Sequence, residues 1–506
     1  MLDVVIVGGG PVGLFLACEL KLAGIDPVVL ERLPEPSQAD KAHGLTGQVV
    51  RLLDHRGLFE RFGGTGAPVP APLFFFGTIP LPLHVLGADN PLYYLPINQR
   101  DIERALAQRA AELGVEVRRG QEVHSLTQFD DHVELLVGDT VLGAKFVVGC
   151  DGGHSVVRKQ SGIAFPGIVD EHVVARAGLV SSSERLSRIA EERGLGAGFQ
   201  RTEQGVIMIA MFDAERPFIS TLEWEDDPED SFPGPGAPMT LAELEASVER
   251  VLGEHVTLAD PPVGAPTLLR RIKGRNTRLA EHYRDRRVFL AGDAAHVHAA
   301  SGGPGLNLGL QDAANLGWKL AAQLHGWAPE TLLDSYQTER RALGARVFMQ
   351  TQSQTALMAP GSDVTALREL FGEMLTRQET VRQIADLMAG SDVRYDMGEP
   401  DPADATGWFA PNVDLVTEDG QQRRLAELCR DGRTLLLDLA GDLADAVEPW
   451  SDRVVRVAAY ADNPPADALL IRPDGYVAWA GTEPDGLQAA LRRWLGEPAV
   501  RSSRAA

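Results

Sequence analysis

A glycine-rich turn around residue 8 constrains the fold of this chain more than any other feature. Val4 to Val7 form a run of four β-branched residues, which is typical of a buried strand. The glycines at positions 8, 9, 10 and 13 let the backbone turn sharply and approach a pyrophosphate, and Leu14 to Ala23 then predict a helix whose N-terminus faces that anion. A second apolar run ends in Glu31, where a dinucleotide-binding βαβ unit places the acid that binds the ribose. This order of elements predicts a dinucleotide site.

The composition narrows the classes of partner. A chain of 506 residues is too long to fold around a single hydrophobic core and suggests about two to four domains. The formal net charge of −23 and the isoelectric point near 5.0 argue against nucleic acid or an anionic membrane as the main partner. Cys18, Cys150 and Cys429 are far apart and form no CxxC pair, so they indicate neither a disulfide framework nor a metal site. No leader-like segment and no membrane-length apolar run is present, from which we expect a cytoplasmic protein.

Apolar periodicity predicts an α/β fold whose first domain is discontinuous. A Rossmann-like dinucleotide-binding domain is expected over 1–165 and again over 276–350, where a buried run from Arg287 leads through glycines into a helix. Alternating segments predict an antiparallel-sheet domain over 166–275, which residues 71–96 are expected to join.

The C-terminal third has a different pattern. A helical segment is expected over 351–389, followed by a linker at 390–411 that is rich in proline, aspartate and glycine. Residues 412–506 show strands and helices in an order that resembles a thioredoxin-like domain. This domain lacks the redox cysteine pair, so thiol–disulfide chemistry is not expected there.

Two further motifs that can carry chemistry lie far downstream of the first turn. One is Cys150-Asp151-Gly152-Gly153-His154-Ser155-Val156-Val157-Arg158. The other begins with Gly292-Asp293-Ala294-Ala295-His296 and continues through 302–307 into the helix at 311–319. An acid at a strand end can accept a hydrogen bond from a hydroxyl group, and glycines at a helix start bring backbone N–H groups close to an electron-rich ring. For Arg158 and Lys319 a surface position is the simpler interpretation.

These three motifs, in this order, resemble those of the class A flavoprotein aromatic hydroxylases of the para-hydroxybenzoate hydroxylase type. The chain is most similar to the bacterial hydroxylases that tailor aromatic polyketides and to their relative that oxidises rifampicin. That subgroup carries a C-terminal thioredoxin-like domain without active cysteines, so the resemblance covers nearly the whole chain. It implies FAD as the cofactor and NADPH or NADH as the co-substrate.

The resemblance also implies a role for individual residues. The FAD pyrophosphate would be held by Gly8, Gly10 and Gly13, with Pro11 and Val12 at the turn. The adenosine would be held by Glu31, Arg32 and the backbone of Val123. The other implied cofactor contacts are Lys41, Gln99, Asp151 between nicotinamide and flavin recognition, Asp293 on the ribityl chain, and Gly305, Leu306 and Asn307 on the isoalloxazine. A solvated helix start remains the alternative for Gln99, and a turn cap remains the alternative for Asp293.

The implied activity is monooxygenation. NADPH or NADH would reduce the flavin, O₂ would add at C4a, and the hydroperoxide would deliver one oxygen atom to an electron-rich polycyclic aromatic, while the flavin carries the hard chemistry. No catalytic acid or base can be named, and a homo-oligomer remains open. Baeyer–Villiger or ring-opening oxygenation on the same scaffold is the near alternative. A flavin dehydrogenase that is no oxygenase and a non-catalytic FAD-fold binding protein are more distant ones.

Four positions depart from the family pattern beside the flavin. Ala300 stands where most relatives have proline, and Pro304 where they have glutamine, which changes the backbone restrictions of this loop. Relatives often carry arginine near Lys41 and Gln48. Lys41 keeps the positive charge but lacks the planar guanidinium of arginine, and Gln48 lacks the charge. These changes leave the placement of the substrate open.

Several aromatic and histidine side chains have two interpretations. The run Phe74-Phe75-Phe76 fits core packing better than the wall of an aromatic-substrate pocket. Trp318 is expected in the core. His296 and His298 have no further Cys/His cluster nearby, so we expect no metal, and His296 is predicted to hydrogen-bond within its loop.

Overall fold

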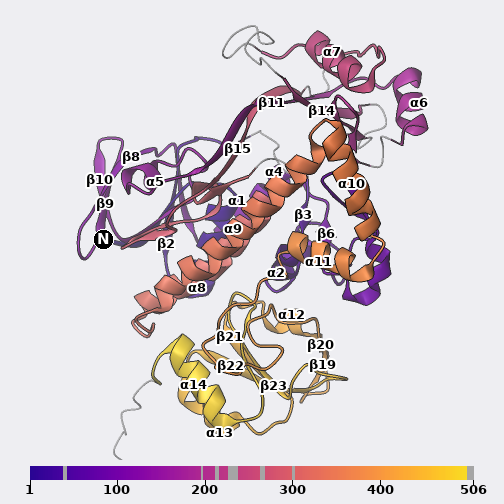
Figure 1. Cartoon of the computed structure of the whole chain (residues 1–506). Coiled ribbons are helices and arrows are strands. Elements are labelled where there is room, and N and C mark those ends of the chain that lie inside the picture. The colour runs from indigo at the N-terminus through magenta and orange to yellow at the C-terminus, as the bar shows by residue number, and fades with distance from the viewer. Residues whose placement is uncertain are drawn as a thin grey trace, which may run out of the picture.

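The computed structural model describes residues 1–37, 43–194, 198–210, 216–225, 238–261, 268–298 and 303–498. Three large sheets organise these residues (Figure 1). The first sheet carries the glycine turn, the second extends away from it on two long strands, and the third belongs to the C-terminal domain. The mixed α/β architecture predicted from the sequence is confirmed.

The first sheet is parallel at its centre, as a dinucleotide-binding fold requires. Its strand order is β16-β17-β10-β1-β2-β7, and β1 pairs in parallel with both β2 and β10. The apolar run from Lys145 to Cys150 predicts a strand, but the hairpin β8–β9 extends β10 on its antiparallel side, so β10 already starts at Thr140. The bounds are β1 Leu2–Val7, β2 Pro27–Glu31, β7 Glu116–Arg119, β8 Val123–Gln128, β9 Val133–Val137, β10 Thr140–Gly149, β16 Arg284–Asp285 and β17 Val288–Leu290.

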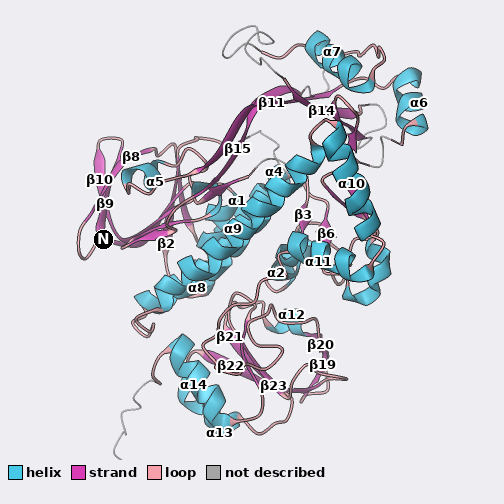
Figure 2. Cartoon of the chain, in the orientation of Figure 1, coloured by secondary structure: helices cyan, strands magenta, loops and turns pink. Residues whose placement is uncertain are grey.

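Helices cover this sheet (Figure 2). Helix α1 packs between α4 and α8, and α8 also packs against the long helix α9. The apolar spacing of Leu45, Val49, Leu52 and Leu53 predicts a helix over 45–56, but Leu45 and Thr46 form the short strand β3 and the helix begins at Gln48. The bounds are α1 Pro11–Leu22, α2 Gln48–Asp54, α3 Leu58–Arg61, α4 Gln99–Glu112, α5 Val156–Gln160, α8 Pro304–Leu324, α9 Leu332–Met358, α10 Ser362–Met374 and α11 Gln378–Ala389.

The middle sheet is antiparallel, with the order β12-β13-β14-β11-β15-β18. Strands β11 and β15 run side by side from the first sheet to the far end of the molecule, where α6 and α7 cover the sheet (Figure 1). The last strand, β18, brings this sheet to the third sequence motif. The bounds are β11 Gly167–Leu179, β12 Gln200–Arg201, β13 Gly205–Ala210, β14 Phe218–Trp224, β15 Leu269–Leu279, β18 His296–Val297, α6 Glu184–Glu192 and α7 Leu241–Leu252.

Residues 43–95 connect the first two sheets through two small ladders. Strand β3 (Leu45–Thr46) pairs with β6 (Tyr94–Leu95), and β4 (Phe74–Phe76) pairs with β5 (Ile79–Leu81), which leads into the 3₁₀ segment η1 (Leu83–Asp89). Phe76 lies in a core and stacks on Phe371 of α10, whereas Phe74 and Phe75 are half-buried. The core interpretation therefore holds for one of the three phenylalanines.

The C-terminal sheet has the order β20-β19-β22-β21-β23-β24, with β21 and β22 parallel and a β23–β24 hairpin. Its arrangement is consistent with the thioredoxin-like domain predicted from the sequence. The preceding segment 390–411 contains no helix or strand, and its Tyr395 and Phe409 are buried. The bounds are β19 Asp414–Thr417, β20 Gln422–Arg424, α12 Leu425–Leu428, β21 Thr434–Asp438, α13 Ala444–Val447, η4 Glu448–Trp450, β22 Val454–Tyr460, β23 Ala468–Ile471, β24 Val477–Ala480 and α14 Pro484–Leu495.

One hydrophobic core joins the first sheet to the C-terminal domain. It extends from Val4 and Leu14 through Trp318 of α8 to Trp450 and Trp494. The C-terminal domain is therefore packed onto the first domain rather than tethered to it. Among the described helices, none has the length and apolar character needed to cross a bilayer.

Candidate cofactor site

A cavity of about 580 Å³ opens at the carboxyl ends of β1, β2 and β10. This is the edge of an open α/β sheet at which ligands bind, and the volume is within the range of small-molecule sites. All three sequence motifs line it. The predicted site residues on its wall are Gly8, Gly10, Pro11, Val12, Glu31, Arg32, Gln99, Val123, Asp151, Asp293, Gly305 and Leu306.

The glycine turn is shaped by close backbone packing. Gly8 has φ +111°, and a Cβ there would overlap the carbonyl of Cys150 at the end of β10. A Cβ on Gly13 would overlap the carbonyl of Gly8, so Gly13 seats α1 against the turn and is absent from the cavity wall. Nothing lies within 4 Å of the Cβ position of Gly10. With Pro11 at the first turn of α1, this helix presents free backbone N–H groups to the cavity.

Glu31 is held at the opposite wall of the turn. Its Oε2 accepts a hydrogen bond from Gly9 N at 2.6 Å, and its Oε1 accepts one from Leu33 N at 2.9 Å. The carboxylate is thus fixed at the end of β2, where a ribose hydroxyl can reach it. Gln99 opens α4 and donates to Glu103 Oε1 at 2.9 Å, which orients it at the cavity.

Asp151 offers an unused acceptor to the cavity. Its Oδ2 caps α5 by accepting from Val156 N at 2.7 Å and Val157 N at 3.2 Å. Its Oδ1 is buried and has no hydrogen-bond partner among the described residues. Burial raises the pKa of this carboxyl group above its ordinary value. A ligand with a donor at this point would satisfy the free oxygen.

The third motif forms a short loop ahead of α8. Asp312 Oδ2 accepts from Gly292 N at 3.1 Å and from His296 Nε2 at 2.7 Å, so this buried acid holds the loop from below. The sequence predicts that His296 hydrogen-bonds within its own loop, but its partner is Asp312 of α8. The loop places Asp293 on the cavity wall, and α8 begins at Pro304 after Gly303, which has φ +65°.

His298 also lines the cavity, although sequence reasoning considered it only as a metal ligand and rejected that role. Its ring lies 5.3 Å from the ring of His296, and neither of its nitrogens has a partner in the described part of the chain. Burial lowers the pKa of His298 to about 3, so the imidazole is neutral at physiological pH. The sequence signal that could have identified His298 as a cavity residue is its position two residues after His296, close to Asp293.

The remaining assigned residues lie close to this wall or outside it. Asn307 is buried in α8, where its Oδ1 accepts from Thr46 N at 3.3 Å, and it is absent from the cavity wall. Gln48 is buried and accepts from Tyr476 of the C-terminal domain rather than facing the cavity. Lys41 and Ala300 lie outside the described residues.

Two basic residues expected at the surface are buried. Arg158 donates to Ala294 O at 2.8 Å and to Gly153 O at 2.9 Å, which ties the second motif to the third. Lys319 is fully buried against Glu339, with Nζ–Oε2 at 2.7 Å. The surface interpretation of both was wrong, because their partners lie far away in the sequence.

The wall of this cavity fits an FAD molecule. Backbone N–H groups at the start of α1 suit a pyrophosphate, Glu31 suits a ribose, and the free Oδ1 of Asp151 and the ring of His298 leave unused hydrogen-bonding capacity inside. The glycines keep that wall free of side chains where the backbone must approach the ligand.

Comparison with known proteins agrees with this fit. Residues 1–351 match the family model for an FAD binding domain, and residues 403–498 match that for the C-terminal domain of aromatic-ring hydroxylases. The chain is 40% identical to the 12-dehydrotetracycline 5-monooxygenase/anhydrotetracycline 6-monooxygenase of Streptomyces rimosus, over 98% of this chain and 99% of that protein. It is 37% identical to the rifampicin monooxygenase of Rhodococcus hoagii, over 99% of each chain.

A solved structure extends the comparison to three dimensions. The Diels–Alderase PyrE3 of pyrroindomycin biosynthesis superposes with a TM-score of 0.84 at 37% identity, over 99% of this chain and 100% of that one. Fold and sequence therefore agree over the full length. The chain belongs to the FAD-dependent monooxygenases of the aromatic-ring hydroxylase family.

Proposed function

We propose that this flavoprotein uses NADPH or NADH and O₂ to hydroxylate a polycyclic aromatic molecule of the polyketide type. The observation that carries the proposal is the convergence of three separate motifs on one cavity. It is supported by full-length similarity to monooxygenases named for tetracycline intermediates and rifampicin. FAD, when bound, supplies electron transfer from the nicotinamide and activation of O₂.

We propose that the residues of the cavity wall divide the binding of FAD among them. The start of α1, with Gly8 and Gly10, would hold the pyrophosphate, and Glu31 the adenosine ribose. Asp293 and the first turn of α8, including Gly305 and Leu306, would hold the ribityl chain and the ring. Arg32, Gln99, Val123 and Asp151 would complete the wall, and Lys41 and Asn307 are proposed as further contacts.

The protein itself contributes placement and exclusion of water. The buried, neutral ring of His298 contributes an uncharged side chain to the cavity wall. A dry wall protects a reactive oxygen donor from hydrolysis and proton leakage.

A related fold does not by itself decide the reaction. Baeyer–Villiger or ring-opening oxygenation remains the second candidate, because Pro304 stands at the first position of α8 beside the cavity, where the family carries glutamine. A relative described as a Diels–Alderase shows that the scaffold also serves a carbon–carbon bond-forming reaction.

One experiment separates these reactions. The yellow holoenzyme is incubated with NADPH or NADH and a panel of anhydrotetracycline- and rifampicin-type aromatics under ¹⁸O₂, and products are analysed by mass spectrometry and NMR. Substrate-stimulated NAD(P)H consumption with one ¹⁸O in a new phenol supports the proposal. One ¹⁸O in an ester or lactone supports the second candidate. An isomerised product without NAD(P)H consumption, or no stimulation by any aromatic, contradicts both.

A further inference from the structure

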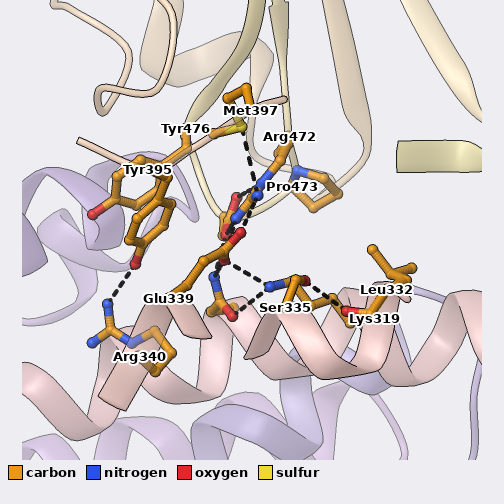
Figure 3. A network of polar contacts seen from close by, with 12 residues as sticks. Lys319, Leu332, Ser335, Glu339, Arg340, Tyr395, Met397, Arg472, Pro473 and Tyr476 are labelled. Carbon is orange, nitrogen blue, oxygen red and sulfur yellow. Dashed lines mark hydrogen bonds and ion pairs between the residues drawn. The ribbon is translucent and has the colours of Figure 1, made fainter. Parts of the chain in front are cut away.

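The turn between β23 and β24 carries an arginine from the C-terminal domain into the first domain. Figure 3 shows Arg472 reaching Glu339 on α9. Its two terminal nitrogens donate to the two oxygens of Glu339 at 2.7 and 2.8 Å, and its Nε donates to Asp474 at 3.0 Å. The guanidinium lies 4.5 Å from the ring centroid of Trp494 and 5.4 Å from that of Trp318. Arg472 is thus enclosed by acids and aromatic faces.

The charges around this arginine are mutually compensated. Lys319 Nζ donates to Glu339 Oε2 at 2.7 Å, and Asn315 Nδ2 donates to both Glu339 and Asp474. Although burial opposes ionisation, Arg472 and Lys319 hold the pKa of Glu339 well below its usual range. Burial lowers the pKa of Lys319 to about 8. Removing one member would leave a buried unpaired charge, so the turn is held firmly in one place.

The next residue of α9, Arg340, lies between this turn and the cofactor cavity. Its Nη1 donates to Tyr395 Oη at 2.9 Å, as the dashed line in Figure 3 shows, and its Nη2 donates to Leu308 O at 3.1 Å. Tyr395 stacks on Tyr476 of the C-terminal domain, with ring centroids 4.1 Å apart. Tyr476 of the C-terminal domain therefore packs against the tyrosine that accepts a hydrogen bond from Arg340.

The other side of Arg340 reaches the loop of the cavity. Its Nε donates to Asp312 Oδ1 at 2.8 Å. Asp312 Oδ2 in turn holds Gly292 N and His296 Nε2, the two ends of the loop that carries Asp293. Against the opposing effect of burial, Arg340 and His296 lower the pKa of Asp312, so the acid is ionised and accepts all three bonds.

We propose that Arg340 and Asp312 are positioning residues of the cofactor site, and that the C-terminal turn at 472–476 holds Arg340 in the orientation that Asp312 needs. The C-terminal domain then completes the cofactor site without lining it. This inference rests on the assignment of FAD to the cavity and not on the identity of the oxygenated substrate. It also explains why the C-terminal domain packs against the first domain: a domain joined only by a flexible tether could not hold Arg340 in place.

The chain offers a matched control at the same interface. Arg424 of the C-terminal domain pairs with the buried Asp54 of α2, and among the described residues neither of the two hydrogen-bonds to Arg340 or Asp312. Arg424→Met therefore weakens the docking of the domain without touching the path to the loop. If looser docking of the C-terminal domain alone weakened FAD binding, the loss of FAD affinity would scale with the loss of Tm in every variant, including Arg424→Met.

The test uses the full-length protein with Asp312→Asn, Tyr395→Phe, Tyr476→Leu, the double variant Asp312→Asn/Tyr476→Leu and Arg424→Met. Tyr395→Phe keeps the stacked ring and removes only the acceptor of Arg340, which preserves folding. The dissociation constant for FAD is measured by fluorescence titration of the apoprotein, without substrate or reductant. Hydrogen exchange of the peptide covering 288–298 and the visible circular dichroism of bound FAD are recorded alongside.

We expect the path variants to weaken FAD binding by about tenfold, with faster exchange at 288–298 and an altered flavin dichroism, while Arg424→Met stays within about twofold at an equal loss of Tm. We also expect the double variant to bind FAD no more weakly than Asp312→Asn alone, since both act on one path. Additive losses, unchanged binding in Tyr395→Phe and Tyr476→Leu, or an equal loss in Arg424→Met would each overturn the proposal. Failure to hydroxylate any aromatic would leave these measurements intact.

Discussion

Two side chains on the cavity wall keep hydrogen-bonding capacity that the protein does not use. Asp151 Oδ1 and both nitrogens of His298 are buried without a partner among the described residues. An unsatisfied buried polar atom costs free energy, so such atoms are retained where a ligand satisfies them. These two residues are where single substitutions separate ligand binding from folding most cleanly.

For His298 we expect a loss of cofactor affinity without loss of fold. His298→Leu should raise the FAD dissociation constant about fivefold, because a net hydrogen bond contributes about 1 kcal/mol, while His298→Asn should restore most of the affinity. Fluorescence titration of the apoprotein measures both. His255→Leu, a substitution of an exposed histidine after α7, is the control. Equal affinities of His298→Leu and the unmodified protein would refute this role.

For Asp151 the two oxygens make separable contributions. Asp151→Ala should lower the free energy of unfolding by about 1 kcal/mol, because the carboxylate's two hydrogen bonds to the first turn of α5 are lost while the Ser155 cap remains. Asp151→Asn keeps an acceptor for those two hydrogen bonds, so its stability should stay close to that of the unmodified protein while FAD binding weakens. Denaturant titration and FAD titration measure the two effects. If Asp151→Asn is as unstable as Asp151→Ala, the role assigned to these two hydrogen bonds is incorrect.

At the level of elements, the start of α8 carries two glycines on the cavity wall with different backbones. Gly303 has φ +65°, whereas Gly305 has an ordinary helical backbone and a Cβ position 3.6 Å from Asp293 Oδ1. Only at Gly303 would a side chain strain the backbone, and only at Gly305 would it approach Asp293.

Two alanine substitutions should show this division. Gly303→Ala should lower the free energy of unfolding by about 1 kcal/mol, the cost of a left-handed conformation for a residue with a Cβ. Gly305→Ala should leave stability unchanged and weaken FAD binding by about tenfold, because its methyl group enters the cavity. Each variant is the control for the other in the same pair of titrations. Identical behaviour of the two would contradict the assignment.

Elements made by local patterns were predictable from the sequence, and those made by distant pairing were not. The placement of its glycines predicts the turn from Gly8 to Gly13, and a 3.6-residue apolar period predicts the helix α4. Strand β11 did not, because Asp170 and Glu171 interrupt its alternation and its stability comes from pairing with β15, about a hundred residues later in the chain. Packing against a distant partner overrode the local pattern there.

The same reasoning explains the errors in the candidate site. Three motifs were recognisable because each is contiguous, and the cavity brings them together. Lys319 and Gln48 were misplaced because their partners, Glu339 and Tyr476, lie on other elements and in the other domain. His298 was recognisable only once both of its nitrogens were found without partners. A buried charge cannot be recognised from sequence before its compensating charge is known.

At the scale of the whole molecule, the interface with the C-terminal domain contains a buried histidine. The ring of His55 packs at a tilt against that of Phe409, with centroids 5.0 Å apart, and neither of its nitrogens has a partner among the described residues. Burial, aided by Arg51, Arg56 and Arg424, holds the pKa of His55 well below its ordinary value of 6.5. The folded protein therefore keeps this ring neutral where the unfolded chain would protonate it.

Acid should loosen this interface. Between the two pKa values the unfolded state binds more protons at His55 than the folded state does, so stability is complete above pH 6.5 and falls as the pH decreases. We expect His55 to contribute a loss of about 2 kcal/mol between pH 7 and pH 5. His55→Phe keeps the ring contact with Phe409 and should lose correspondingly less stability over this range, measured by denaturant titration. Parallel pH profiles of the two proteins would exclude this contribution.

The pairing of Glu339 with Arg472 has a consequence for the newly made chain. The acid is synthesised 133 residues before the arginine that compensates it. A ribosome adds about 5–20 residues per second, so Glu339 is synthesised several seconds before Arg472. During that time Lys319 of α8 is a compensating cation that the chain already contains. We therefore expect α8 and α9 to reach their final packing only after β23 and β24 have been synthesised.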